Sequence, residues 1–305
     1  MKLHKVLFCL FLTTAIPVFS QIKGVIVDSK NQPIPYVSIA VANENIGTTS
    51  QDDGSFILRI SNTSKTILFS ALGYEKYSAK ASNIQKVILQ ETKYPLDEVV
   101  LDTYKNKKQI VVGKIQSGGF RYSFSVNFHS VYYNRTQEMV AFPYIQKIKF
   151  YTKSKIDKAN IRIRLVECNP DLSFGEEMFK QNQIVEVRKG TSSNILDLKE
   201  LKLKIPEFGF YIVFEKLLVQ KNKFNQEIKY TNISGEKVKA QKTQYQPDLA
   251  FVPTEINNYS YSPNGLNWKE GKKIQLENPK NFSNILMRKY DDNYLVPSIQ
   301  LTLSN

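Results

Sequence analysis

Two adjacent carboxylates, Asp52 and Asp53, precede Gly54 in the stretch "GTTSQDDGSF", and acids beside a glycine can belong to a calcium loop. In an EF-hand loop, oxygen ligands occupy positions one, three and five, glycine occupies position six, and a bidentate acid occupies position twelve. With Gly54 at position six, position twelve is Ile60, and the intervening residues alternate as in a strand. An Asp-Gly pair ahead of such alternation is typical of a hairpin turn, because both residues accept positive φ angles. We therefore expect these acids to turn the chain rather than to bind a metal.

Nucleophilic catalysis by serine or cysteine usually needs a histidine base, and His129 is the only histidine after the first 20 residues. It lies in "VNFHSVYY", where apolar and polar residues alternate, so a structural histidine at the surface of a sheet is favoured over a catalytic one. Cys168 has no lysine or histidine beside it and is expected to be a half-buried thiol in a loop. The sequence contains no Gly-x-Ser-x-Gly, phosphate-loop or dinucleotide glycine pattern.

Glycoside hydrolysis needs only two carboxylates, so the scarcity of histidine does not exclude it. The candidate acids gather around one loop or end a strand, and they are Glu167, Asp171, Glu176, Glu177 and Glu215. Acids beside proline and glycine are more often turn residues and solvated strand edges than catalytic pairs. We therefore predict that the protein is not an enzyme and needs no cofactor.

Sugar binding is a stronger possibility, because the stretch "NYSYSPNGLNW" sets aromatic residues around a Pro-Asn-Gly turn. Tyr259, Tyr261 and Trp268 could stack on sugar rings, while Asn264 or Asn267 could supply hydrogen bonds. The alternative, which we favour, is that Trp268 packs under the loop as part of the core.

The first 20 residues open with two lysines and continue with a broken apolar run, "VLFCLFLTTAIPVF". The run is too short for a membrane-spanning helix and ends beside a small residue, which is typical of a secretory signal peptide. We expect cleavage before Gln21 and an exported chain in the periplasm, or associated with the outer membrane or cell surface. One cysteine then remains, so no intramolecular disulfide can form.

The mature chain would carry 40 basic and 28 acidic residues, a net charge of +12. Residues 21–92 hold seven basic and six acidic residues, so nearly all of the excess lies in residues 93–305. Such an excess favours anionic partners. Most of the lysines alternate with apolar residues, as in "IQKIKFYTKSK", so a solvated strand face is the commoner explanation. Export and the absence of a recognition motif argue against nucleic acid as a partner.

Short apolar runs separated by turn signals fill residues 21–92. In "VSIAVAN", Val37, Ile39 and Val41 share one face of a strand, and "SFILRI", "TILFSALGY" and "KVILQE" continue the pattern. Each run can bury one face against a second sheet, so this segment predicts a small β-sandwich.

The same segment, "IKGVIVDSKNQPIPYVSIAVANENIGTTSQDDGSFILRI" followed by "LFSALGYEKY", resembles the carboxypeptidase regulatory-like domain. The matching residues are Gly24, Val27, Asp28, Pro33, Pro35, Gly47, Thr48, Asp53, Gly54, Ser55, Phe56, Gly73 and Tyr74. The resemblance implies a transthyretin-like (prealbumin-like) sandwich that serves as an accessory module without catalysis, in zinc carboxypeptidases and at the front of TonB-dependent outer-membrane receptors.

The sequence contains neither the catalytic domain of a zinc carboxypeptidase nor the full barrel of a TonB-dependent receptor. A zinc carboxypeptidase holds its metal with two histidines and a glutamate, and only His129 remains after the signal peptide. The segment "YPLDEVVLDTY" resembles the stretch that connects this domain to the rest of the chain in the receptors. A 22-stranded barrel at about 10 residues per strand needs about 220 residues, however, and only 185 come after residue 120.

We expect residues 93–120 to form a linker that contributes an edge strand, and residues 121–305 to form a second, larger sandwich of the jelly-roll type. Its strands alternate clearly: in "NIRIRLVE", Ile161, Ile163 and Leu165 face one way while Arg162 and Arg164 face the other. This part resembles, more weakly, the jelly-roll-like domains that accompany such modules in exported bacterial proteins, a resemblance that implies no activity.

From the sequence we predict an all-β, two-domain, exported protein of a Gram-negative envelope that is not catalytic. The function we favour is structural or binding, through protein–protein interaction with an envelope protein, for which strand addition at a sheet edge is a physical means. The alternative is carbohydrate binding through the aromatic loop residues of the larger domain, with polysaccharide as the partner. The oligomeric state is left open.

Overall fold

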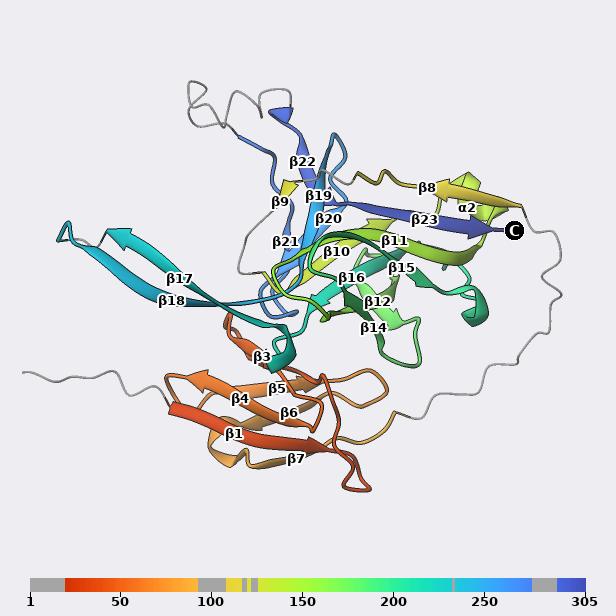
Figure 1. Cartoon of the computed structure of the whole chain (residues 1–305). Helices are drawn as coiled ribbons and strands as arrows, with labels where there is room; N and C mark the ends of the chain where they lie inside the picture. Colours follow the sequence, from red (N-terminus) through yellow and green to blue (C-terminus); the bar gives the residue numbers. More distant parts are fainter. Residues whose placement is uncertain (1–19, 93–107, 117–119, 122–125, 232–233, 276–289) are drawn as a thin grey trace, which may run out of the picture.

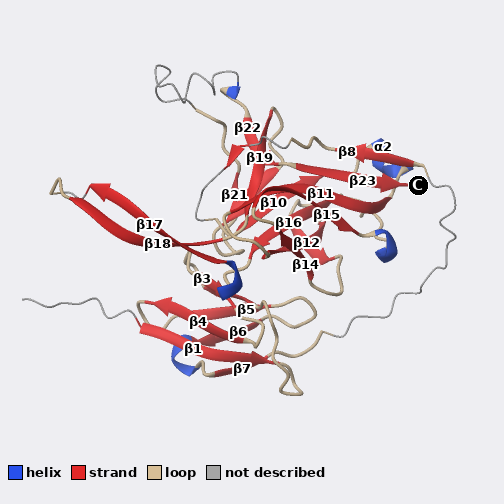
Figure 2. Ribbon diagram, in the orientation of Figure 1, coloured by secondary structure: helices blue, strands red, loops and turns tan. Residues whose placement is uncertain are grey.

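The computed structural model describes residues 20–92, 108–116, 120–121, 126–231, 234–275 and 290–305, and β-strands dominate it (Figure 1, Figure 2). The strands form a smaller N-terminal sandwich and a larger C-terminal one, which confirms the predicted fold class. Among these residues no helix is long and apolar enough to cross a membrane. The predicted signal peptide lies outside the described residues except for Ser20, and so does most of the predicted linker.

The smaller domain consists of two sheets that face each other. One has the order β4-β1-β7, in which β1 runs antiparallel to β4 and parallel to β7. The other has the order β3-β2-β5-β6 and is antiparallel throughout. The elements are β1 (Ser20–Val27), β2 (Ser38–Val41), β3 (Gly47–Thr49), β4 (Ser55–Ile60), β5 (Thr66–Ser70), β6 (Tyr77–Lys80), the 3₁₀ turn η1 (Ala81–Asn83) and β7 (Lys86–Ile88).

The core of the smaller domain follows the alternation in the sequence. Ile39 and Val41 on β2 are at most 1 % exposed, and Phe56 on β4 meets Phe69 on β5 edge to face, with ring centroids 6.0 Å apart. Strands β4 and β5 therefore contribute every second side chain to one shared apolar layer.

The stretch with the two adjacent acids turns the chain between β3 and β4, as predicted, but these strands lie in different sheets, so the turn is not that of a hairpin. The carboxylate of Asp53 accepts a hydrogen bond of 2.9 Å from the backbone N–H of Ser55, and Gly54 adopts a φ of +73°. A Cβ atom at Gly54 would lie 2.4 Å from the carbonyl oxygen of Ile26, so glycine is required by both conformation and space.

The larger domain also has two sheets. The first has the order β13-β12-β16-β10-β20-β21, with β14 beside β12, and the second has the order β22-β19-β11-β23-β8, with β15 beside β11 and β9 beside β19. The strands of the first sheet are β10 (Phe128–Tyr133), β12 (Ala159–Cys168), β13 (Phe174–Glu177), β14 (Gln183–Val187), β16 (Phe210–Lys216), β20 (Tyr259–Ser262) and β21 (Lys269–Glu270). The strands of the second are β8 (Gln109–Val112), β9 (Phe120–Arg121), β11 (Tyr144–Ser154), β15 (Gly190–Asp197), β19 (Asp248–Thr254), β22 (Tyr294–Pro297) and β23 (Ile299–Ser304).

The main strands of the larger domain cross from one sheet to the other at nearly every step. β10, β12, β16 and β20 lie in the first sheet, and β11, β15, β19 and β23, which come after them in turn along the chain, lie in the second. β8, from the predicted linker, pairs with β23 as an edge strand. The short helical elements are α2 (Gln137–Ala141), η2 (Lys199–Leu201) and η3 (Gln220–Asn222).

The alternation on β12 is as the sequence predicts, since Ile161, Ile163 and Leu165 are at most 2 % exposed in the core between the sheets. Arg162 and Arg164 are on the opposite face of the strand. That face is covered by the smaller domain, so Arg162 is only 3 % exposed.

A long hairpin projects away from both sandwiches (Figure 1). It consists of β17 (Lys223–Thr231) and β18 (Lys237–Tyr245), which pair with each other along their whole length and with no other described strand. We refer to these two strands as the arm. Its sequence has too few apolar residues to predict a strand by burial, which is why sequence analysis does not identify it.

Candidate functional site

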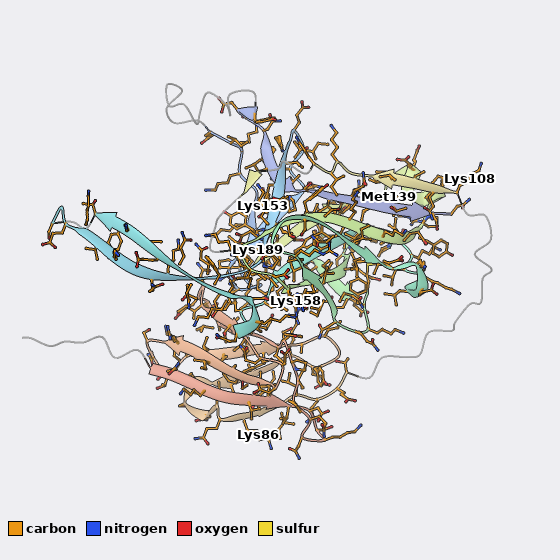
Figure 3. The ribbon with its side chains drawn as sticks, viewed as in Figure 1. Lys86, Lys108, Met139, Lys153, Lys158 and Lys189 are labelled. Atoms are coloured by element: carbon orange, nitrogen blue, oxygen red, sulfur yellow. The ribbon has the colours of Figure 1, made fainter. Side chains whose placement is uncertain are left out.

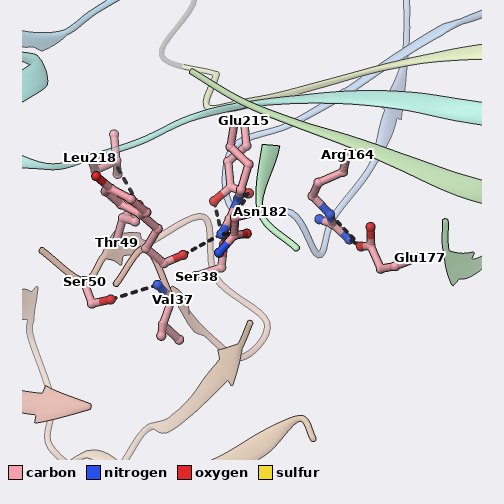
Figure 4. A network of polar contacts seen from close by, with 11 residues as sticks. Val37, Ser38, Thr49, Ser50, Arg164, Glu177, Asn182, Glu215 and Leu218 are labelled. Carbon is pink, nitrogen blue, oxygen red and sulfur yellow. Dashed lines mark hydrogen bonds and ion pairs between the residues drawn. The ribbon is translucent and has the colours of Figure 1, made fainter. Parts of the chain in front are cut away.

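The two domains meet at a polar network centred on Arg162. Its guanidinium donates two hydrogen bonds to Glu215 (2.8 and 2.5 Å), one to the carbonyl of Tyr36 (2.6 Å), one to the hydroxyl of Ser38 (3.2 Å) and one to Asn182 (3.4 Å). The Ser38 hydroxyl in turn donates to Glu215 at 2.7 Å, and Figure 4 shows Ser38, Asn182 and Glu215 of this network from close by. All five guanidinium N–H groups are thus used, so Arg162 joins the domains and has no donor left for a ligand.

Three further hydrogen bonds join the domains. Thr49 and Gln51 on the smaller domain accept bonds from the backbone N–H groups of Leu218 (3.1 Å) and Gln220 (2.8 Å). The amide of Asn264 donates to a backbone carbonyl of the smaller domain, that of Glu44, at 2.5 Å. The contact between the domains is therefore held at several positions besides Arg162, and the space between the sheets has defined walls.

This space is a cleft of about 530 Å³ between β2, β5 and β6 of the smaller domain and the outer face of the first sheet of the larger domain. The segment 68–78 supplies most of one wall. The other wall is formed by Phe128, Arg164, Val166, Phe174, Glu177, Val213 and the loop Asn264–Trp268. The cleft thus combines apolar side chains with a few charged ones, which is typical of a ligand-binding site.

Trp268 and Phe174 form an aromatic platform on the wall of the larger domain. Their ring centroids lie 4.8 Å apart at 37°, and Phe128 meets the indole edge to face at 6.4 Å. The indole N–H donates to the carbonyl of Gly265 at 3.2 Å. Trp268 is therefore half-buried and held in place from several sides. On the opposite wall, Tyr77 is 43 % exposed, so each wall presents an aromatic ring.

Beside the aromatic platform lies the ion pair of Arg164 and Glu177, visible in Figure 4. The guanidinium donates to one carboxylate oxygen of Glu177 through Nε, at 2.6 Å, and through Nη2. About a third of the Arg164 side chain is exposed. Only two of its five N–H groups donate to protein atoms in the described part of the chain, so it differs from Arg162 in having donors available.

The structure places the five residues of the predicted sugar site on different surfaces. Trp268 and Asn264 line the cleft, and Asn267 is exposed beside it. Tyr259 is 7 % exposed and stacks on Tyr261 at 6.0 Å, and both rings face the core of the larger domain rather than the cleft. The Asn264 side chain also accepts bonds from the N–H groups of residues 266 and 267, so it shapes the loop that carries Trp268.

His129 is not at the surface of a sheet, as the sequence suggests, but inside the larger domain. Its Nδ1 lies 2.7 Å from the Tyr259 hydroxyl, and its ring meets that of Phe251 on the facing sheet at 5.5 Å. Burial, and then the nearby Lys216 ammonium, lower the pKa of His129 to about 3. The surface expectation is wrong because the residue belongs to the inward-facing set of its strand. Cys168 is likewise buried at the end of β12, not half-buried in a loop.

The candidate acids for hydrolysis have separate structural surroundings. Glu215 and Glu177 are each paired with an arginine, and Asp171 accepts hydrogen bonds from Ser173 that lower the pKa of its carboxyl. Glu167 and Glu176 are exposed on strands β12 and β13. In the described ranges, no three histidine, cysteine or acidic side chains gather as a group that could hold a metal ion.

Sequence reasoning misses half of the cleft, since it considers only the loop of Trp268. Arg164, Phe174 and Tyr77 receive no role from spacing alone. The one available signal is the pair of arginines at alternate positions of an otherwise apolar strand, which indicates that something polar covers that face.

Comparison with known families supports the assignment of the smaller domain. The family model of the CarboxypepD_reg-like domain matches residues 22–101. No curated protein matches the chain significantly.

Proposed function

Because the smaller domain, which the carboxypeptidase regulatory-like family model matches, supplies one wall of the cleft, we propose that the chain is an exported, non-catalytic binding protein that holds a carbohydrate between its two domains. The proposed location is the envelope of a Gram-negative cell, in the periplasm or at the outer surface. It is supported by the signal-peptide features of residues 1–20.

The observation that carries the proposal is Trp268 on the wall of the cleft. Sugar rings bind flat aromatic faces through their C–H groups, and a rigid ring loses little conformational entropy when it does so. The hydrogen bond to Gly265 and the contacts with Phe174 and Phe128 fix the indole before any ligand arrives. The volume of about 530 Å³ suits a short oligosaccharide, within the usual range of about 300–1,000 Å³ for ligand pockets.

The surroundings of the acids support a role without catalysis. A glycosidase needs one carboxyl group that can donate a proton and a second that can act as base or nucleophile. Glu177 and Glu215 each accept two hydrogen bonds from an arginine side chain, so both carboxylates are already engaged by protein groups. The cleft therefore suits binding better than hydrolysis.

Tryptophan fluorescence tests this proposal directly, because Trp268 is the only tryptophan in the chain. We expect a saturable change in emission when the mature protein is titrated with a matching oligosaccharide from a panel. In calorimetry, Trp268→Ala is expected to weaken that binding by about 30-fold, as for a central hot-spot aromatic. Tyr230→Ala is the control, since this tyrosine is 49 % exposed on the arm, and it should bind as the wild type does. Equal affinity of the wild type and Trp268→Ala, or no binding to any sugar, would contradict the proposal.

Protein interaction, the function favoured by the sequence, is a second candidate, and the arm is the observation that supports it. Its two strands carry five lysines and one glutamate, a net charge of +4, and their outer edges pair with no other described strand. An isolated two-stranded hairpin is only marginally stable in water. We propose an acidic partner protein that adds a strand to one of these edges, since a second, equally basic arm would be repelled.

A further inference from the structure

We propose that the cleft selects an anionic, carboxylate-bearing sugar, such as a uronic acid, which Arg164 and Lys76 recognise from opposite walls. This inference rests on the proposed carbohydrate function and names the class of ligand. It is drawn from the donors and charges that remain in the cleft once the contacts between the domains are accounted for.

The first step is the difference between the two arginines that line the cleft. All five N–H groups of Arg162 donate to protein acceptors, so its charge and geometry are committed to the domain contact. Arg164 directs only Nε and one Nη2 hydrogen to Glu177, and about a third of its side chain is exposed. Three of its N–H groups are thus available on a planar group that suits a carboxylate.

Lys76 provides the second step. It lies in the segment between β5 and β6, is exposed, and lines the cleft, whereas the neighbouring Glu75 does not. Across the described ranges the Lys76 ammonium makes no hydrogen bond or ion pair. Within the described part of the chain, its three donors therefore have no protein acceptor and can turn to a ligand.

The third step is the net charge of the cleft. The pairs of Arg162 with Glu215 and of Arg164 with Glu177 each cancel, which leaves the charge of Lys76. A neutral sugar would leave this charge without a counterion, whereas a carboxylate would accept charge-assisted bonds about twice as strong as neutral ones. The mature chain, with a net charge of +12, also attracts anionic ligands over longer distances.

The experiment compares oligogalacturonate with a neutral β-linked gluco-oligosaccharide of the same length by calorimetry, using the mature two-domain protein. We expect the uronate to bind at least 10-fold more tightly at low ionic strength, with the difference reduced by added salt. Lys76→Gln should weaken uronate binding roughly 2- to 5-fold, the usual size for an exposed charge, and leave any neutral-sugar binding unchanged. Arg164→Lys, which keeps the charge but loses the planar group, should also weaken it.

Lys86→Gln is the matched control. It makes the same change of charge in the same domain, but Lys86 lies on the side of the smaller domain away from the cleft (Figure 3). Equal losses in Lys76→Gln and Lys86→Gln would show a general charge effect and overturn the inference. Tighter binding of the neutral sugar would overturn it too, while leaving the proposed function intact. Binding of neither sugar, nor of any other in the panel, would remove the proposed function itself.

Discussion

The Ser38 hydroxyl donates a hydrogen bond of 2.7 Å to the carboxylate of Glu215, although the two residues lie 177 positions apart and in different domains. Glu215 is 1 % exposed and is held at the same time by the guanidinium of Arg162. The carboxylate of Glu215, on a strand of the larger domain, is thus stabilised by a hydroxyl of the smaller domain. This contact is one of several between the domains that hold the two walls of the cleft in place.

Removing the arginine from this network should destabilise the protein strongly. Arg162→Ala leaves the buried Glu215 carboxylate without its counterion, and breaking a buried pair in this way costs about 3–5 kcal/mol. Ser38→Ala removes one neutral donor to that carboxylate and should cost about 1–2 kcal/mol. Urea denaturation measures both effects, with Arg188→Ala, at an exposed position, as the control. If Arg162→Ala lowers the free energy of unfolding by less than about 1 kcal/mol, the network does not stabilise the protein as we expect.

Stability should fall in mild acid because of His129. Burial lowers its pKa to about 3, whereas the unfolded chain has the ordinary value of about 6.5, so between these values only the unfolded state binds the proton. The free energy of unfolding should therefore decrease by about 1.4 kcal/mol per pH unit as the pH falls below about 6.5. His129→Gln, which cannot take up the proton, should show a shallower slope between about pH 6.5 and 5. The free energies of unfolding are measured by urea denaturation at each pH. Equal slopes against pH for the wild type and His129→Gln would contradict a buried, neutral histidine.

Gly54 should tolerate alanine poorly. A Cβ atom there would lie 2.4 Å from a backbone oxygen, and the φ of +73° is itself unfavourable for alanine. Gly73→Ala is the matched control, because Gly73 has a φ of +87° in the same domain but open space around its Cβ position. We expect a loss of about 1 kcal/mol for Gly73→Ala and roughly two to three times as much for Gly54→Ala. Equal melting temperatures of Gly54→Ala and Gly73→Ala would contradict this expectation, because the turn at Gly54 would then accommodate a Cβ atom at no extra cost.

The arm should be dispensable for folding. At its base the Lys155 ammonium lies 4.9 Å from the ring of Phe224 and 2.5 Å from the amide oxygen of Gln226, and the arm pairs with no other described strand. Deleting residues 228–240, which removes the outer part of both strands, should change the melting temperature of the protein by no more than a few degrees. A large loss of stability would show instead that the arm supports the larger domain.

The sequence predicts the layers of this protein better than their contacts. Alternation identifies the faces of β2, β4 and β12, because burial in a sandwich repeats every second residue. It says nothing of what covers the outer face of β12, so the burial of Arg162 appears only in the structure. It also gives Tyr259 and Trp268 the same role, although one faces the core and the other the cleft.

The arm and the cleft escape sequence analysis for different reasons. The arm is held by hydrogen bonds within its own hairpin, so apolar periodicity, the main signal for strands, is weak there. The cleft is assembled from segments far apart in the chain, such as Lys76 and Arg164. Only the packing of one domain on the other brings them together.

Hydrogen–deuterium exchange with and without bound oligosaccharide tests the central claim most directly. A ligand held between the domains should slow exchange on both walls together, in residues 68–78 of the smaller domain and in residues 174–177 and 264–268 of the larger one. The arm should exchange at the same rate in both states. Protection confined to one domain, or found only away from these segments, would contradict a binding site in the cleft.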